Sequence, residues 1–210
     1  MTTATPASTG YRTYVLVLLI LIYMFNFLDR QIVGILAVPI MKDLELTRSQ
    51  MGLMGGIAFA ALYCTLAIPL AWAADRFSRV WIMTGALTIW SAFTVACGYA
   101  SSFWSMFAMR MGVGVGEAGG VAPAYSLIAD YFPPKQRARA LAAFSFGIPL
   151  GMALGILLGG LIAAHIDWRW AFISVGLAGL VLAPLFRLTV RDPVRGGLDP
   201  APQADKAAVP

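Results

Sequence analysis

Four charged residues lie inside long apolar stretches of this sequence: Asp29, Arg30, Arg110 and Glu117. A charge at membrane depth costs roughly 2.5–3.5 kcal/mol on insertion scales, so each of them needs a reason to be there. A carboxyl group in a low-dielectric site takes up a proton more readily than it does in water, and a guanidinium attracts anions. We therefore predict that Asp29 and Glu117 exchange protons and that Arg30 and Arg110, with the neighbouring Asn26, contact an anionic substrate.

The spacing of these residues predicts how they are arranged. Arg110 precedes Glu117 by seven residues, which is two helical turns, so both project from one helix face about 10 Å apart. Asp29 and Arg30 lie near the middle of an earlier apolar stretch, and we expect all four to meet in a polar cavity at the membrane midplane. The alternative is a buried ion-pair network that only fixes the helix register. The sequence leaves both interpretations open.

Composition places nearly the whole chain in a membrane. Of its 210 residues, 60% are hydrophobic and 12% are charged, against about 25% charged in a soluble domain. A membrane span needs about 20 apolar residues, and six stretches qualify: residues 14–40, 49–73, 80–99, 103–132, 138–165 and 168–188. We expect an all-α membrane protein with a six-transmembrane-helix bundle over residues 14–188. Residues 1–13 are expected to form a tail, and residues 189–210 a flexible tail or linker.

The basic residues predict the orientation of this bundle. If the N-terminus is cytoplasmic, ten Lys and Arg residues lie on the cytoplasmic side, three lie outside, and two lie within spans. The cytoplasmic ten are Arg12, Arg76, Arg79, Lys135, Arg137, Arg139, Arg187, Arg191, Arg195 and Lys206. The positive-inside rule then places both termini in the cytoplasm, and we expect the inner membrane of a bacterium. The formal charge of +5 is therefore assigned to lipid headgroups and not to nucleic acid.

A short charged segment, residues 75–79, joins the second and third spans on the expected cytoplasmic side. Acidic side chains stabilise helix N-termini and basic side chains stabilise helix C-termini. We interpret this segment, with charges from the next inner corner, as a cytoplasmic latch. Its assigned residues are Asp75, Arg76, Arg79, Asp130 and Arg137. The alternative is that these charges only determine the topology.

Glycines recur every four residues in the fifth span, at Gly147, Gly151, Gly155 and Gly159. Small residues at this spacing form one stripe and let helix backbones approach closely in lipid. Pro149 interrupts the same helix, and we expect it to bend there. The stripe predicts either tight static packing or a surface that slides during alternating access.

A weak internal repeat relates the two halves of the bundle. Asp29 lies fifteen residues after Tyr14, at the start of the first span, and Glu117 lies fifteen residues after Ser102, at the start of the fourth. Two three-helix units of opposite orientation produce such a pattern. We therefore expect a 3+3 inverted repeat, as in transporters built from inverted repeats.

Several motifs resemble those of the N-terminal half of the major facilitator superfamily. Residues 71–79 (AWAADRFSR) are similar to the signature Gly-x-x-x-Asp-Arg-x-Gly-Arg between helices 2 and 3, with Ala71 and Ser78 in place of the two glycines. The stretch RMGVGVGEAG from Arg110 resembles the helix 4 motif, GIPLGMALGILLGG resembles the glycine-rich helix 5 motif, and WRWAF from Trp168 is similar to the start of helix 6. Together they cover nearly the whole chain.

Within that superfamily the chain resembles the spinster-like group, through NFLDR at residues 26–30 and VGVGEA at residues 113–118. The resemblance implies a proton-coupled secondary carrier, a symporter or an antiporter, of organic and lipid-like anions such as lysolipids. It implies that Asp29 and Glu117 are protonation sites and that Arg30 contacts the anion or tunes them. It implies protons as the coupling ion and no other cofactor. The residues themselves give no reason to expect a metal site, because His165 is the only histidine and has no Cys nearby.

Carriers of this family have about twelve helices in two halves, whereas this chain has six expected spans. We therefore expect a partner in addition to membrane lipids and the substrate, either a second six-helix half or a second copy. The alternative function is a non-transporting, truncated or split half-carrier that acts as a binding or assembly module. A membrane-embedded enzyme is disfavoured because the sequence shows no nucleophile and base at one depth.

Overall fold

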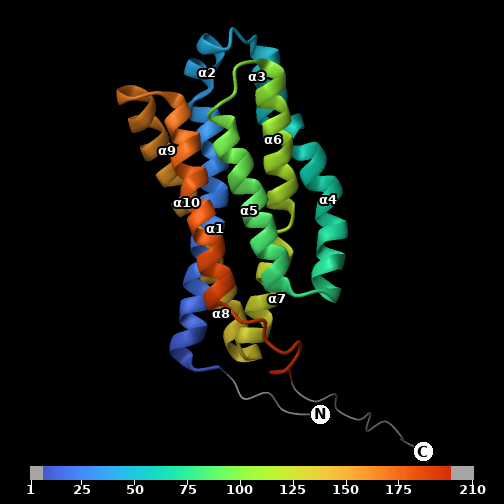
Figure 1. The fold of residues 1–210 in the computed structure, drawn as a ribbon. Helices are drawn as coiled ribbons and strands as arrows, with labels where there is room; N and C mark the ends of the chain where they lie inside the picture. Colours follow the sequence, from blue (N-terminus) through green and yellow to red (C-terminus); the bar gives the residue numbers. More distant parts are fainter. Residues whose placement is uncertain (1–6, 200–210) are drawn as a thin grey trace, which may run out of the picture.

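The computed structural model describes residues 7–199, apart from the side chain of Ala163, and this part of the chain consists of helices without strands. The helices are α1 Thr9–Ile35, α2 Ala37–Asp43, α3 Arg48–Gly55, α4 Ile57–Arg76, α5 Arg79–Cys97, α6 Phe103–Ala118, α7 Val121–Tyr131, α8 Pro134–Ser145, α9 Gly147–His165 and α10 Trp168–Thr189. They form an elongated bundle (Figure 1). Helix α1 begins and α10 ends at the same end of it, which we call the terminus end, and α2 and α3 lie at the opposite end.

Five of the described segments are long and apolar enough to cross a membrane: Thr9–Ile35, Arg48–Arg76, Arg79–Cys97, Pro134–Ile162 and Trp168–Thr189. The prediction of an all-α membrane fold is confirmed. Four of the six expected spans are each two consecutive helices: 14–40 is α1 and α2, 49–73 is α3 and α4, 103–132 is α6 and α7, and 138–165 is α8 and α9. The expected fourth span, 103–132, is not among the five segments. The chain turns at Gly119, where a Cβ atom would lie only 2.9 Å from that of Ala86 on α5. Close approach of α5 therefore coincides with the break in the helix.

Local signals explain where several helices begin. Thr47 and Gln50 form a capping box at the start of α3, and Ser102 and Ser105 form one at the start of α6. The Asp167 carboxylate accepts a hydrogen bond from the backbone N–H of Arg169 at the start of α10. Each cap satisfies N–H groups that have no partner within the helix.

Glycines set the spacing between α9 and α1. A Cβ atom on Gly151 would collide with the carbonyl oxygen of Met24, and one on Gly155 would lie 2.7 Å from Cβ of Gln31. Gly147 is also tight, at 3.0 Å from the carbonyl oxygen of Ile20, whereas a Cβ on Gly159 would meet its nearest atom at 3.7 Å. Three of the four predicted stripe positions thus lie in close backbone contact with α1.

The predicted bend at Pro149 is replaced by a break in the helix three residues earlier. The chain breaks at Phe146, between α8 and α9, and Pro149 is the third residue of α9. Proline is tolerated in the first helical turn because its missing N–H would have no partner there. The break therefore precedes the proline.

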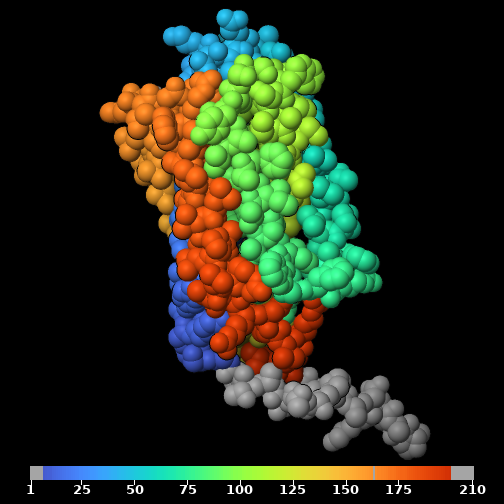
Figure 2. Space-filling view, in the orientation of Figure 1, coloured from blue at the N-terminus to red at the C-terminus, as the bar shows by residue number. Residues whose placement is uncertain are grey.

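Helices α10, α5 and α6 pack together as a second group, with α5 between α10 and α6. These three helices lie side by side along the visible face of the space-filling view (Figure 2). Gly176 and Gly179 of α10 pack against Val95 and Ser91 of α5. This packing holds α5 and α6 in place beside the charged residues of α1.

Candidate functional site

The first buried ion pair joins α1 to α6. Nη1 of Arg110 lies 2.7 Å from Oδ2 of Asp29, and the two side chains are 2% and 0% exposed. The hydroxyl of Thr94 on α5 donates to the other oxygen, Oδ1, of Asp29 at 3.0 Å. Both carboxylate oxygens of Asp29 are therefore bound by protein groups, and the pair is closed off from the surroundings.

The second pair also joins α1 to α6. Nε and Nη2 of Arg30 each lie 2.8 Å from Oε2 of Glu117. The Glu117 side chain is fully buried, whereas the Arg30 side chain is 28% exposed. The Arg30 guanidinium lies over the rings of Phe27, Phe59 and Tyr63, at 5.1, 4.6 and 5.0 Å from their centroids. Arg30 is thus the member of the four-charge cluster that an incoming ligand can reach.

The two pairs give the cluster balanced charge, with two carboxylates and two guanidiniums. Asp29 and Arg30 are adjacent on α1, yet they take separate partners two turns apart on α6. Buried charges are tolerated when they are paired and hydrogen-bonded, which this arrangement achieves. Asn26, one turn earlier on α1, is 5% exposed, and its side-chain oxygen has no hydrogen-bond partner in the described part of the chain.

The structure thus brings together all five residues that were assigned to proton exchange and substrate contact. It places Arg110 differently from the predicted anion contact, since its guanidinium is enclosed and held by Asp29. Thr94 and the aromatic residues around Arg30 were not identified from the sequence. A threonine or tyrosine within an apolar span was the only available signal, and such residues are common in membrane helices.

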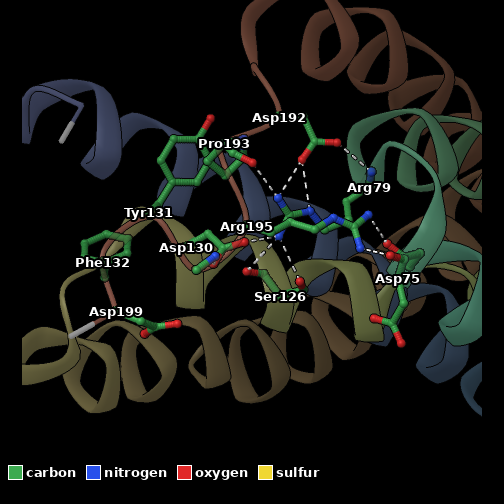
Figure 3. Close-up of polar contacts among 12 residues, drawn as sticks. Asp75, Arg79, Ser126, Asp130, Tyr131, Phe132, Asp192, Pro193, Arg195 and Asp199 are labelled. Atoms are coloured by element: carbon green, nitrogen blue, oxygen red, sulfur yellow. Dashed lines mark hydrogen bonds and ion pairs between the residues drawn. The ribbon is translucent and has the colours of Figure 1, made fainter. Parts of the chain in front are cut away.

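At the terminus end, Arg79 is the centre of a second polar cluster (Figure 3). Its side chain is 1% exposed and forms ion pairs with Asp130 of α7 and, at 2.8 Å, with Asp192 beyond α10. It also donates to the hydroxyl of Ser126 at 2.9 Å and to the carbonyl of Pro193 at 2.8 Å. Arg79 therefore ties α5 to α7 and to the segment that follows α10.

Residues 190–199 follow α10, within the tail that the sequence predicts to be flexible, and in the structure they lie against the ends of other helices. Arg195 donates hydrogen bonds to the carbonyls of Ala74, Asp75 and Phe77, at the end of α4. Figure 3 shows Arg195 beside Asp75. The backbone N–H of Gly196 donates to Asp130 at 2.9 Å. Helix C-termini leave carbonyls without partners, and an arginine satisfies them well. Lys206 and the rest of 200–210 lie outside the described residues, as do residues 1–6.

The predicted latch residues fall into two groups. Arg79 and Asp130 meet directly, whereas Asp75 enters the cluster through its backbone carbonyl only. Arg76 stacks on the ring of Trp72 at 3.8 Å. Arg137 pairs with Asp199 at 2.6 Å and donates to the carbonyl of Phe132. Asp192 and Arg195 were not identified from the sequence, although both belong to the string RDPVR.

Within the described residues, no three His, Cys, Asp or Glu side chains come close enough together to hold a metal ion. The cluster around Glu117 consists of two arginines and two carboxylates, joined in two ion pairs.

Comparison with known proteins gives a consistent picture. The family model of the Major Facilitator Superfamily matches residues 19–210. The chain is 37% identical over 191 residues to an MFS-type efflux pump of Mycolicibacterium smegmatis, covering 90% of this chain and 44% of that protein. It is 34% identical over 199 residues to protein spinster homolog 1 of Homo sapiens, covering 93% of this chain and 37% of that one.

Solved structures give the same result. A bacterial homolog of the human lysosomal transporter Spinster, in an inward-facing and unoccupied conformation, matches with a TM-score of 0.88 and 38% identity over 95% of this chain. The inward-facing and occupied conformation matches with a TM-score of 0.86 and 39% identity over 92% of this chain. Each match covers 47% of that structure's chain. This chain, spanning about half the length of the relatives it matches, therefore belongs to the Major Facilitator Superfamily and to its spinster-like group.

Proposed function

We propose that this chain is part of a proton-coupled secondary carrier for organic, lipid-like anions. The observation that carries the proposal is the Arg30–Glu117 pair, in which the carboxylate is fully buried and the guanidinium is 28% exposed. A ligand anion can reach Arg30 without first entering the protein core. The family relationship supports transport as the activity, since the matched relatives include an efflux pump and spinster proteins.

The pair suggests how anion and proton are coupled. An anionic headgroup that binds Arg30 competes with Glu117 for the same guanidinium nitrogens, Nε and Nη2. Glu117 then remains buried without its counter-ion, and a buried carboxylate that loses its partner takes up a proton. Anion binding and proton uptake at Glu117 would therefore occur together.

The Asp29–Arg110 pair has a different part in this proposal. Asp29 is held by Arg110 and Thr94, so it exchanges a proton only after Arg110 moves. Arg110 lies on α6 two turns before Glu117, and a displacement of α6 would change both pairs together. We propose that Asp29 is a second proton site that responds to the conformational change and not to the first contact with the ligand.

A carrier of this kind encloses its substrate between two halves, so this bundle needs a second half. Two spans are poorly buried. Of an 18-residue apolar stretch in each span, only 11% is buried in Arg48–Arg76 and 22% in Pro134–Ile162, against 44–50% in the other three spans. We propose that a second six-helix unit, or a second copy, covers these two faces and encloses Arg30. Membrane lipids would cover the remaining apolar surface.

The charged clusters at the terminus end support a proposal for the orientation of the bundle in the membrane and for the role of the latch residues. It carries the Arg79 and Arg195 clusters and the ends of α4, α7 and α10. By the positive-inside rule we propose that this end faces the cytoplasm of a bacterium, with the chain in the inner membrane. We propose that the Arg79 cluster holds this end of the bundle together as the carrier changes its facing.

Calorimetric binding of lysophosphatidylglycerol to the purified chain in detergent tests this function. The wild type is expected to bind, and Arg30→Gln is expected to bind at least about tenfold more weakly because it removes a charge-assisted contact. Arg169→Gln is the matched control, since Arg169 pairs with Asp43 at the opposite end of the bundle. Equal affinities for wild type and Arg30→Gln would contradict the proposal. Binding that leaves the protonation of the chain unchanged would favour the binding-module alternative.

A further inference from the structure

Three buried polar atoms beside the Arg30–Glu117 pair have no hydrogen-bond partner in the described part of the chain. They are Oδ1 of Asn26, Nε1 of Trp90 and Oε1 of Glu117. The residues are 5%, 4% and 1% exposed. Buried polar atoms are hydrogen-bonded in the great majority of cases, so three such atoms without partners require an explanation.

All three residues line one small cavity. Its volume is about 20 Å³, and its other walls are mostly apolar, including Ile22, Met83, Leu87 and Phe144. By the same measure of volume, a single water molecule needs about 10–15 Å³ and two to four polar partners. The cavity therefore has room for one water molecule.

The hydrogen-bonding groups suit a water molecule. The indole N–H of Trp90 donates only, the free oxygen of a Glu117 carboxylate accepts only, and the Asn26 amide offers either group because its oxygen and nitrogen are interchangeable in orientation. A water molecule can accept from Trp90 and donate to Glu117 and Asn26. The position of Trp90 is fixed, because its backbone packs directly against Gly116, where a Cβ atom would lie 2.6 Å from its Cα.

The cavity lies on one side of Glu117. Its α1 residues, Leu19 to Asn26, precede Arg30 along a helix that begins at the terminus end, and its α5 residues begin only four positions after Arg79. Oε2 of Glu117 faces Arg30 and the exposed side of the cluster, whereas Oε1 is the free oxygen of a residue that lines the cavity. One oxygen of the Glu117 carboxylate therefore binds Arg30, and the other is free to bind a group in the cavity.

We propose that Asn26, Trp90 and Glu117 bind a single water molecule, and that this water delivers protons to Oε1 of Glu117 and removes them from it on the terminus side. In uptake, solvent at the terminus end supplies the proton to the water; an O–H bond of the protonated water then breaks, the Oε1–H bond of Glu117 forms, and the water is left neutral in its site. Release is the reverse, with the proton returned to that solvent. Asn26 and Trp90 are then positioning residues for proton exchange. This last role rests on the proposed function, whereas the binding of the water does not.

Few other charges act on this site. The titratable groups around Glu117 are Asp29 and Arg30 of α1, Arg110 of α6 and, beyond Arg30, Tyr63 of α4. Tyr23 of α1 is the titratable residue that lines the cavity with Glu117. The lining residues from α5, α7 and α8 carry no titratable side chain. The polar groups that can hold the water are therefore those of Asn26, Trp90, Glu117 and Tyr23.

Infrared difference spectroscopy on the full chain in lipid nanodiscs tests the proposal. Exchange of ordinary water for H₂¹⁸O at fixed pH is expected to shift one narrow O–H band of a bound water molecule. Trp90→Phe keeps the ring and removes the N–H, and it is expected to reduce this band about fivefold to tenfold through loss of one hydrogen bond. Trp168→Phe is the matched control, because Nε1 of Trp168 is equally buried and lacks a partner within the described residues but lies at the start of α10.

A second variant protects the test against a folding defect. Asn26→Leu replaces the amide with an apolar side chain of nearly the same shape, and it should reduce the same water band. The Glu117 carboxyl band is identified by its loss in Glu117→Gln. Both Trp90→Phe and Asn26→Leu should slow proton exchange at that carboxyl band. A band that persists in both Trp90→Phe and Asn26→Leu would overturn the proposal, as would the lack of any H₂¹⁸O-sensitive band in the wild type. If the water band behaves as expected and the Glu117 band never responds to pH, the proposed function fails and the water site remains.

Discussion

Asp192 binds both the backbone and the side chain of Arg79, which lies 113 residues earlier in the chain. The Asp192 carboxylate accepts from the backbone N–H of Arg79 at 2.7 Å and from its Nε at 2.9 Å. The same guanidinium pairs with Asp130 of α7. One buried arginine thus connects the start of α5, the end of α7 and the segment after α10, which makes this segment part of the folded bundle.

Asp192→Asn is expected to lower the thermal stability of the chain in detergent, because it weakens charge-assisted hydrogen bonds to a buried arginine. We expect a loss of about 1.5–3 kcal/mol. Asp199→Asn is the control, since its pair with Arg137 is between side chains that are 48% and 24% exposed, and such pairs contribute at most about 1 kcal/mol. Equal melting temperatures for the two variants would show that residue 192 lies outside the cooperative structure.

Arg195→Gln is expected to loosen the end of α4, because three backbone carbonyls there lose their donor. Hydrogen–deuterium exchange followed by mass spectrometry should show about tenfold faster exchange for amides in residues 74–79. Arg191→Gln serves for comparison, since the Arg191 side chain is exposed and makes no hydrogen bond with the described residues. Unchanged exchange in Arg195→Gln would mean that solvent or lipid satisfies these carbonyls equally well.

Removing one member of the Asp29–Arg110 pair is expected to destabilise the bundle by about 3–5 kcal/mol, because the other charge stays buried without a partner. Asp29→Asn and Arg110→Met should each show this in thermal unfolding. The double variant Asp29→Leu with Arg110→Met should recover most of the loss, since paired removal leaves no buried charge. A double variant that is as unstable as the two singles combined would exclude a simple ion pair.

Gly151→Ala is expected to separate α9 from α1 and to cost about 1–3 kcal/mol, since the added methyl group meets backbone atoms that cannot move aside. Gly159→Ala on the same helix should be neutral or stabilising by up to about 1 kcal/mol, because it meets only ordinary van der Waals contacts and alanine favours helix. Thermal unfolding of both variants decides the matter. The opposite ranking would contradict the packing of these two helices.

The sequence identifies the apolar stretches because the length of such a stretch is a local property, but it does not predict that residues 14–40, 49–73 and 138–165 divide at Leu36, Gly56 and Phe146. It does not predict that residues 103–132 divide at Gly119, since that depends on how closely α5 approaches. It identifies all four intramembrane charges but not their pairing: Arg110 binds Asp29 and Arg30 binds Glu117 because of the relative rotation of α1 and α6. Asp192 and Arg195 were missed because a segment rich in Pro, Gly and Asp is typical of a linker, and only tertiary contacts order it.

The central claim is that an anion on Arg30 releases Glu117 to take up a proton. Calorimetry of lysophosphatidylglycerol binding in buffers with different ionisation enthalpies measures the protons taken up per ligand bound. The account predicts an uptake approaching one proton for the wild type and for Glu45→Gln, a control on an exposed loop, and no uptake for Glu117→Gln, with binding retained. The same proton uptake in Glu117→Gln as in the wild type would contradict it.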